Sequence, residues 1–549
     1  HRDLHRLIRR QRQMCIRDRH NNFFINSPTG SGKTLTALLI IKELKKEYDI
    51  EPTVYVVRTI NEYSPILRDV RKFNLPLKVS GLIGKERLCD FEWKWLLKEL
   101  EGEVNICNVC PKKSMIYKGL FPEEFIKTQS FWIPLEKIPK EYCKYRTLIS
   151  TIFHADITLA TLPYLLGRAR RFLEMLKPYR ILIVDEAHNF ENINQFISVS
   201  INKKDIDILL RSGFDVRNLK DFFSKFDVKK NELKLIEKEK FIEECGNLDN
   251  EIIHEYERIL QHHLNGNVRH AKAILRVVRF YRYVDTPYMD LFVTNRGFKL
   301  LVTDVSGLIN DAIFEYNIFM SGTLPPHDYI RNVWGIDGLY IDVERKFKLF
   351  RGNRKYFWVN TVTSKFEFRE KNIDKMRKIL DKLLSVVPKV VLVVFSSYDY
   401  LSRFTDLAKK YNAIVEDEKT KIENVENEVK NGGKNIIFAV AGGKLTEGIE
   451  LVRNGRSMIK TIIIAGVPYP VPDDYNKRKA QKIVEKLGYK GGDVVFRYTV
   501  HIPALIYTKQ AIGRGIRSDK DYNNVFLLDW RFRYFFDDLG IEKVYLVKL

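Results

Sequence analysis

The chain has 549 residues, with 93 Lys and Arg against 70 Asp and Glu, which gives a formal net charge of +23 at pH 7. This length exceeds what one hydrophobic core supports, so several domains are expected. So large a positive surplus favours a polyanionic partner, although a merely basic enzyme would also show it. No apolar run of about 18 residues is present, which argues against a membrane span.

Cysteine content bears on the compartment. Six cysteines in a chain of this length do not suggest a secreted disulfide scaffold, and we see no signal peptide. They indicate a reducing compartment, so for a prokaryotic host we expect a cytoplasmic protein associated with the nucleoid.

The first 20 residues differ in composition from the rest of the chain. They contain seven arginines and no lysine, whereas the remainder is rich in lysine. We set residues 1–20 apart from the fold prediction as an anomalous segment, and leave open whether it is a native basic arm or a non-native terminus.

A glycine-rich loop lies between two apolar segments near residue 30. Residues 23–26 are predicted to form a strand, and residues 35–40 to belong to a helix. A strand that enters a helix through such a loop gathers free backbone N–H groups and the positive end of the helix dipole, which predicts a phosphate site. Lys33 is expected to reach the β- and γ-phosphates of ATP, and Thr34 to hold Mg²⁺. The predicted nucleotide-binding residues are Ser27, Gly30, Ser31, Gly32, Lys33 and Thr34.

A second nucleotide element follows the apolar segment 181–184, which leads directly into Asp185 and Glu186. Asp185 is expected to hold Mg²⁺ through water, and Glu186 to orient and deprotonate the attacking water. His188 is expected to link the site to bound nucleic acid. The four letters Asp-Glu-Ala-His are weak evidence alone, but they are strong about 150 residues after a phosphate loop and directly after a buried strand.

Four cysteines lie between these two elements. Two of them form a C-x-x-C pair, and the outer two can complete a set of four thiolates, which suits either tetrahedral zinc or an iron–sulfur cluster. The spacing leaves both metals open, and four unliganded core cysteines are the less favoured alternative. The predicted metal ligands, within an insertion at residues 81–150, are Cys89, Cys107, Cys110 and Cys143.

Two further stretches of the first half are candidates for nucleic-acid contact. Residues 203–290 combine charge with apolar residues at helical spacing, which predicts an amphipathic helical subdomain. Basic and aromatic residues alternate between 269 and 283, a pattern that suits single-stranded nucleic acid about as well as a solvated helix face. Arg58 follows the predicted strand 54–57, at the edge where α/β folds place ligands.

The second half repeats the α/β pattern. Apolar segments at 390–395, 435–440 and 461–465 alternate with helix-like stretches, which predicts a second doubly wound sheet. It carries no phosphate loop. Gln510, Arg514 and Arg517 instead fall on one helical face, from which we expect them to reach the nucleotide of the first half. Arginine fingers of this kind contribute about 10³–10⁵ in rate.

Taken in order, these motifs resemble those of a superfamily 2 helicase. The cysteine insertion and the helical insertion make the chain specifically similar to the XPD-type iron–sulfur DNA helicases in their compact archaeal form. The segments that carry the resemblance are 27–34, 58–62, 185–188, 321–324, 442–450, 467–474, 510–517 and 529–532.

The resemblance implies an α/β fold with two RecA-like motor domains, each a doubly wound parallel sheet, and with both insertions in the first. The implied boundaries are 21–80, 151–202 and 291–345 for motor domain 1, 81–150 for the iron–sulfur domain, 203–290 for the helical arch and 346–549 for motor domain 2.

The resemblance also implies an activity and its cofactors. The expected protein is an ATP-dependent DNA helicase, monomeric and active in DNA repair with repair proteins as partners, that moves 5′→3′ on single strands and unwinds forked DNA. It would use ATP, Mg²⁺ and a 4Fe–4S cluster on the four cysteines, which decides between the two metals. Glu450 joins the expected nucleotide site, and the expected DNA contacts are Arg58, Tyr145, Tyr469 and Arg531.

Two alternatives remain at this stage. One is a DinG-like helicase that acts on RNA–DNA hybrids or displacement loops. The other is a non-enzymatic iron–sulfur protein that binds nucleic acid or senses redox state and has a silent ATP site. The complete set of ATP-site residues argues against the second alternative.

Overall fold

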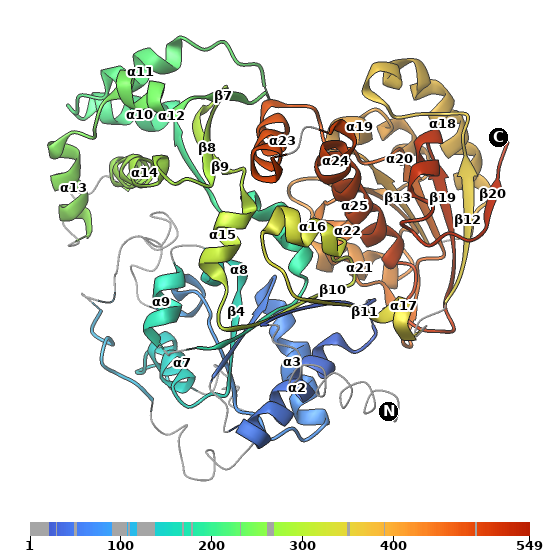
Figure 1. Cartoon of the computed structure of the whole chain (residues 1–549), viewed down its shortest axis with the longest axis horizontal. Helices are drawn as coiled ribbons and strands as arrows, with labels where there is room; N and C mark the ends of the chain where they lie inside the picture. Colours follow the sequence, from blue (N-terminus) through green and yellow to red (C-terminus); the bar gives the residue numbers. More distant parts are fainter. Residues whose placement is uncertain are drawn as a thin grey trace.

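The computed structural model of the chain describes residues 21–28, 30–48, 52–90, 107, 110–117, 138–166, 169–176, 179–230, 232–260, 268–347, 352–388, 390–488 and 491–548. Two parallel sheets flanked by helices form its framework, and a smaller helix-rich unit lies beside the first of them (Figure 1). The anomalous segment 1–20 and most of 91–137 lie outside the described residues.

The first sheet has seven strands, and every pairing in it is parallel. Its order is β11-β1-β10-β5-β2-β4-β3, so strands far apart in sequence are neighbours. Parallel neighbours end at the same edge, and the loops after β1, β2, β5 and β10 therefore meet there. The strands are β1 (Asn22–Asn26), β2 (Thr53–Val57), β3 (Val79–Gly81), β4 (Ile157–Thr161), β5 (Ile181–Val184), β10 (Tyr316–Ser321) and β11 (Leu339–Asp342).

The second sheet is also parallel and seven-stranded, in the order β14-β15-β13-β18-β19-β12-β20. The three strands predicted in this half are present as β13, β15 and β18, and all five residues of each are buried. The predicted α/β fold with two doubly wound parallel sheets is confirmed. The strands are β12 (Asn353–Val359), β13 (Val391–Phe395), β14 (Ile414–Val415), β15 (Ile436–Val440), β18 (Thr461–Ala465), β19 (Tyr522–Leu528) and β20 (Val544–Leu546).

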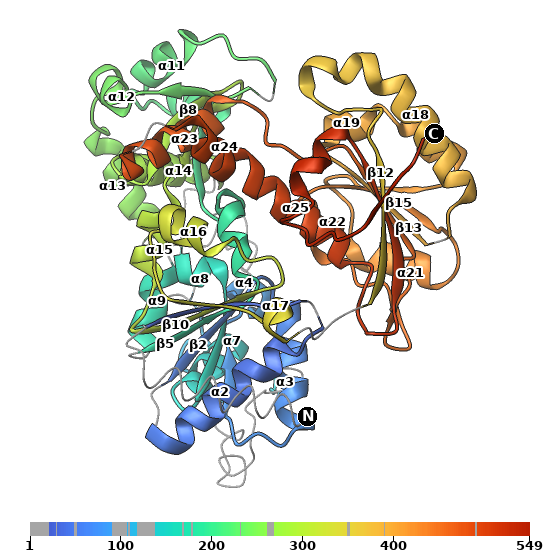
Figure 2. The same cartoon turned by 45° about the vertical axis from the view of Figure 1, so that its right-hand side comes forward.

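Helices cover both sheets (Figure 2). Those of the first half are α2 (Lys33–Tyr48), α3 (Tyr63–Lys72), α4 (Lys85–Leu88), α7 (Lys144–Ile152), α8 (Leu162–Leu166), α9 (Ala169–Leu176), η5 (Ala187–Gln195), α15 (Val305–Ala312), α16 (His327–Tyr329), η6 (Ile330–Trp334) and α17 (Val343–Phe347). Those of the second half are α18 (Arg369–Val386), α19 (Tyr398–Ser402), α20 (Thr405–Lys410), α21 (Ile422–Lys430), α22 (Lys444–Gly448), α23 (Asp474–Leu487), α24 (Gly492–Phe496), η8 (Arg497–His501), α25 (Ile502–Gly513) and η9 (Trp530–Phe535). Within the described residues, no helix has the length and apolar character needed to cross a membrane.

The arch unit, residues 198–302, contains the expected amphipathic helices and also a four-stranded antiparallel sheet that the sequence did not predict. Phe241 and Phe298 join the helices to this sheet, with ring centroids 5.3 Å apart. The basic stretch is used partly for packing, because Arg276 pairs with Asp205 at 3.3 Å. The elements are β6 (Ser198–Asn202), α10 (Lys203–Arg211), α11 (Arg217–Ser224), β7 (Lys234–Ile236), α12 (Lys238–Cys245), α13 (Asn250–Leu260), α14 (Val268–Val284), β8 (Met289–Thr294) and β9 (Gly297–Val302).

Helix α23 crosses from the second half to the first. In the chain it lies between β18 and β19 of the second sheet, yet Figure 2 shows it beside the arch unit. Ile483 of α23 belongs to the hydrophobic core of the first half. Its Asp474 carboxylate accepts a hydrogen bond from the Leu235 amide of β7 at 3.2 Å, and Arg478 pairs with Asp290 of β8 at 3.2 Å. The two halves are therefore linked through α23 as well as through the chain connection.

The hairpin between β8 and β9 of the arch sheet requires a glycine at position 297. Gly297 has φ +145°, and a Cβ atom there would lie 2.0 Å from the Ile201 carbonyl oxygen of β6. We expect Gly297→Ala to loosen the pairing of β6 with β9 and to destabilise the arch by about 1–3 kcal/mol. Hydrogen exchange of residues 198–202 measures this. Gly492→Ala, which has open space, is the control, and equal protection in both variants would contradict the prediction.

Candidate active site

The loop after β1 is held by a contact between two of its own serines, and it lies next to the second half. The hydroxyl oxygens of Ser27 and Ser31 lie 2.6 Å apart. Gly30 and Gly32 have φ +85° and +87°, a region that disfavours side chains. At Gly30 a Cβ atom would stand 3.1 Å from the carbonyl oxygen of Arg517. The predicted phosphate loop is therefore next to the segment that carries the predicted arginine fingers.

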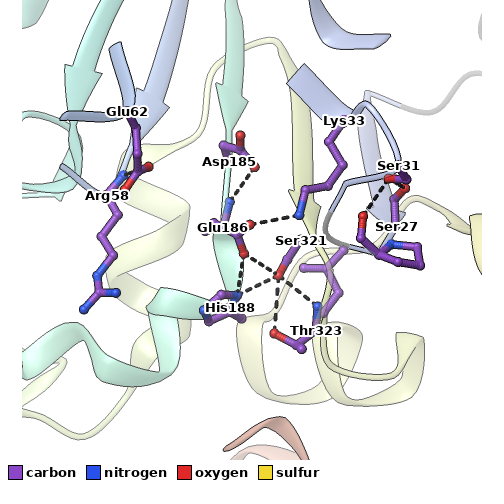
Figure 3. Close-up of polar contacts among 12 residues, drawn as sticks. Ser27, Ser31, Lys33, Arg58, Glu62, Asp185, Glu186, His188, Ser321 and Thr323 are labelled. Carbon is purple, nitrogen blue, oxygen red and sulfur yellow. Dashed lines mark hydrogen bonds and ion pairs between the residues drawn. The ribbon is translucent and has the colours of Figure 1, made fainter. Parts of the chain in front are cut away.

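Lys33 and Glu186 form a partly buried ion pair at the centre of the site (Figure 3). Lys33 Nζ donates to Glu186 Oε1 at 2.9 Å, and 8% of the Lys33 side chain is exposed. Burial lowers the pKa of Lys33, but the Glu186 and Asp185 carboxylates more than offset this and leave the pKa raised. Burial raises the pKa of Glu186, yet Lys33 and then His188 hold it well below its usual value. Both groups are therefore charged at neutral pH.

Asp185 and Thr34, the two residues predicted to hold Mg²⁺, both lie near the hydroxyl of Tyr55. The Tyr55 hydroxyl donates to Asp185 Oδ2 at 3.3 Å. Burial and then Asp185 raise the pKa of Tyr55 well above its usual value, and the nearby Thr34 side chain acts against this rise. Burial raises the pKa of Asp185, and Lys33 offsets only part of this effect. A carboxylate beside a hydroxyl at the phosphate loop is a donor set of the kind that Mg²⁺ takes at nucleotide sites.

Glu186 is held in an unusual backbone conformation. Its φ of +49° is left-handed, which costs a non-glycine residue about 1–3 kcal/mol unless the surroundings fix it. Its carbonyl accepts hydrogen bonds from the Asn189 amide at 3.0 Å and from the Asn189 side chain at 2.7 Å. Its carboxylate accepts from Ser321 Oγ at 3.1 Å, and His188 Nδ1 lies 2.6 Å from the same hydroxyl. Figure 3 shows Lys33, His188 and Ser321 converging on this carboxylate.

One acidic residue of the site was not singled out from the sequence. Glu62 accepts hydrogen bonds from the Arg58 amide and the Thr59 hydroxyl, both at 3.1 Å. Burial and then the charge of Asp185 raise the pKa of Glu62 to about 7. The available signal was its place just after β2, at the sheet edge where the other site residues lie.

The three site residues predicted in the second half differ from one another in their contacts. Arg517 has a side chain 9% exposed, lies 3.6 Å from the Glu450 carboxylate, and its charge lowers the pKa of Lys33. Arg514 donates to the Thr446, Glu447 and Ile449 carbonyls at the end of α22. Burial and then Arg517 lower the pKa of Arg514 to about 10. Gln510 is buried, and its amide has no hydrogen-bond partner within the described part of the chain.

Arg58 is engaged with the second half. Its guanidinium forms an ion pair with the carboxylate of Glu447 on α22, which also accepts from Asn192 Nδ2 at 3.0 Å. Burial raises the pKa of Glu447, although Arg58 and His188 act against it. The expected DNA contact Arg58 thus takes part in the interface between the two halves.

The other expected DNA contacts are largely interior. Tyr145 is 8% exposed and belongs to the core of the first half. Arg531 is also 8% exposed, pairs with the fully buried Asp529 at 2.7 Å and lies over the Tyr469 ring at 5.0 Å. In this structure Tyr145 and Arg531 pack in the interior, and only a rearrangement would bring them to a DNA strand.

The four predicted metal ligands are partly buried, and none forms a disulfide. Burial raises the pKa of Cys143, and the nearby thiols of Cys107 and Cys110 raise it further. The Cys143 sulfur also caps α7 by accepting from the Arg146 amide at 3.4 Å. Four thiols of this kind suit an iron–sulfur cluster by their chemistry. Among the residues that the structure describes, however, no three Cys, His, Asp or Glu side chains form a group that could hold a metal.

Comparison with known proteins agrees with this architecture. A family model for a helicase C-terminal domain matches residues 380–534. A model for the res subunit of type III restriction enzymes matches residues 4–211, so its match begins inside the anomalous segment.

Curated relatives are helicases. The ATP-dependent DNA helicase XPD of Sulfolobus acidocaldarius is 34% identical over 541 residues, which covers 93% of this chain and 93% of the relative. The ATP-dependent DNA helicase CHL1 of Meyerozyma guilliermondii is 24% identical over 483 residues, with 71% of this chain and 57% of the relative covered.

Solved structures give the same result. One titled XPD_Helicase matches with a TM-score of 0.79 at 28% identity and covers 100% of this chain and 99% of its own. Another, titled XPD_APO, matches with a TM-score of 0.73 at 26% identity and covers 100% of both chains.

The site assignment is tested at Glu186. Replacing it with Gln removes the group that accepts a proton from water while keeping its size, so we expect kcat for ATP hydrolysis to fall by about 10²–10⁴-fold. ATP binding should persist, because Lys33 remains. Steady-state ATPase rates and binding of a fluorescent ATP analogue measure the two effects. Glu174→Gln on the exposed part of α9 is the control. Near-normal turnover in Glu186→Gln would place water activation elsewhere.

Proposed function

This chain belongs to the XPD family of ATP-dependent DNA helicases, and on that premise we propose that it moves 5′→3′ along single-stranded DNA and unwinds duplex at forks. The observation that carries the proposal is the meeting of Lys33, Asp185 and Glu186 with Arg517 of the second half. A motor of this kind needs nucleotide groups from both halves, so that hydrolysis changes how the halves contact each other.

Lys33 performs the first step of the proposed mechanism. It exchanges its Glu186 partner for the β- and γ-phosphates of ATP. Since Lys33 is the first of the charges that lower the pKa of Glu186, this exchange lets burial raise that pKa. Glu186 then becomes a stronger base, held by Ser321 beside the attacking water.

Metal and arginine groups complete the hydrolysis site. Thr34 and Asp185 would hold Mg²⁺, which supplies neutralisation of phosphate charge when bound. Arg517 adjoins the phosphate loop and would stabilise charge on the transferred group, with Arg514 behind it. When the phosphate charge is lost, Lys33 pairs with Glu186 again. The nucleotide then attracts Arg517 less strongly.

DNA enters the proposal through the interface between the halves. A DNA phosphate would compete with the Glu447 carboxylate for Arg58, so strand binding and the contact between halves are linked. The net charge of +23 supports binding to a polyanion with strong salt dependence. The expected single-stranded DNA path therefore runs across the interface and along the arch unit.

A 4Fe–4S cluster belongs to the same proposal. The cluster would be held by Cys89, Cys107, Cys110 and Cys143. It would cross-link the insertion covalently and keep it rigid where it meets the DNA duplex. We also place the protein in DNA repair, as a monomer that works with repair proteins in the cytoplasm at the nucleoid. The non-enzymatic alternative is set aside, because the family consists of ATP-dependent enzymes.

Direction and substrate are tested with tailed duplexes. We expect ATP-dependent unwinding of a duplex with a 5′ single-stranded tail and little with a 3′ tail. Single strands should also stimulate ATP turnover. Lys33→Ala, which removes the phosphate ligand, should lower both activities by about 10²-fold or more and retain DNA binding. A requirement for a 3′ tail would overturn the direction. A marked preference for RNA–DNA hybrids or displacement loops would favour the DinG-like alternative.

The cluster is tested by Cys107→Ser. We expect this variant to lose bound iron and visible absorbance, and with them the unwinding activity, because one of four ligands is removed. Cys245→Ser is the matched control, since Cys245 is buried in the arch unit apart from the four ligands. Iron content and unwinding are measured on protein purified without oxygen. Unwinding by iron-free protein would contradict the bracing role.

A further inference from the structure

The segment η5, residues 187–195, begins directly after Glu186 and contacts three elements of the second half. Asn192 donates to Glu447 of α22 at 3.0 Å and accepts from the Tyr507 hydroxyl of α25 at 2.7 Å. Asn194 donates to the Tyr475 hydroxyl of α23 at 2.9 Å. Helices α22, α23 and α25 therefore all contact the segment that continues from the catalytic carboxylate.

Glu191 of this segment forms an ion pair with α23. Its carboxylate accepts hydrogen bonds from the Tyr329 hydroxyl at 2.6 Å, the Trp334 indole at 2.8 Å and Lys479 Nζ of α23 at 3.0 Å. Only 6% of the Glu191 side chain and 12% of the Lys479 side chain are exposed. Three donors on one carboxylate fix its position closely.

The burial of this pair needs an explanation other than stability. A buried ion pair is seldom more stable than a well-packed apolar substitute, and its attested use is to specify one arrangement over others. Despite burial, the pKa of Lys479 is raised by Glu191 and that of Glu191 is lowered by Lys479. Both groups are charged, and the ion pair specifies one packing position of α23 against η5.

Helix α23 contacts the arch unit with the neighbouring face. Asp474 accepts from the Leu235 amide of β7, and Arg478 pairs with Asp290 of β8. The same helix therefore contacts both the arch, where the proposed function places DNA, and η5, which itself also contacts the arch through Asn194 and Val302.

We propose that Lys479 and Glu191 are positioning residues that connect the arch to the catalytic carboxylate, so that DNA against the arch raises ATP turnover through α23 and η5. The inference rests on the proposed DNA-stimulated activity. Glu186 needs a left-handed backbone, and η5 continues directly from it. In this proposal, a change in how α23 packs against η5 moves Glu191. Because Glu186 lies five residues earlier in the chain, the orientation of its carboxylate changes as well.

The test removes the pair without leaving a buried charge. In the double variant Lys479→Met and Glu191→Gln, the glutamine carbonyl still accepts from the Trp334 indole and its NH₂ group can donate to the Tyr329 hydroxyl, but the ion pair to α23 is lost. We expect the ratio of DNA-stimulated to basal kcat to fall about fivefold or more. KM for ATP should change less than about twofold, since the phosphate loop is untouched. Lys477→Met is the control, because Lys477 is 65% exposed and pairs with Asp474 Oδ1, which leaves the hydrogen bond from the Leu235 amide to Asp474 Oδ2 in place.

A milder variant guards against misfolding. Tyr475→Phe removes the hydrogen bond that the Tyr475 hydroxyl accepts from Asn194 of η5 and the one that it donates to the Val302 carbonyl of β9, and we expect a smaller fall in the same ratio. If wild-type ATP turnover is not stimulated by DNA, the proposed function fails. If it is stimulated and both variants keep the full ratio, the inference is overturned. An equal loss of basal and stimulated turnover with a raised KM would indicate a purely structural role and would also overturn it.

Discussion

The site depends on the neutralisation of charges that the sheet forces together. Parallel strands end at one edge, so Lys33, Asp185 and Glu186 are placed in the same buried volume. Isolated charges there would be costly, and only mutual pairing keeps them ionised. The Lys33–Glu186 pair is therefore a resting arrangement that phosphate can replace, since ATP brings charge of the same sign as the carboxylate. This exchange links binding to base strength within one pair of side chains.

The same constraint extends across the interface. Arg517 adds positive charge beside the phosphate loop, and Arg58 and Glu447 pair between the halves. Each partner of these contacts is largely buried, so a change in charge at the nucleotide alters the balance of the whole interface. In the proposed mechanism the nucleotide phosphate engages Arg517 and a DNA phosphate engages Arg58, and both arginines belong to this interface, which gives a physical basis for coupling hydrolysis to strand movement.

Sequence reasoning succeeded where the signal is local. The buried strands β13, β15 and β18 and the glycine loop are each encoded within a few residues, by apolar runs and turn chemistry. It missed the arch sheet, because β7 is a three-residue strand that begins with a lysine. It also missed the crossing of α23 and the roles of Glu62 and Glu191. Their meaning comes from partners distant in sequence, which periodicity does not specify.

Those missed residues share one property with the predicted ones. Glu62 is a partly buried carboxylate and Glu191 has a buried side chain, and each accepts at least two hydrogen bonds that fix a short segment next to the site. Buried polar groups tolerate few alternative arrangements, because an unsatisfied one costs about 1–3 kcal/mol. A motor needs two defined arrangements rather than a continuum, and buried networks at element ends supply such discrete choices. The left-handed Glu186 lies between two of these networks, so its orientation follows whichever arrangement they adopt together.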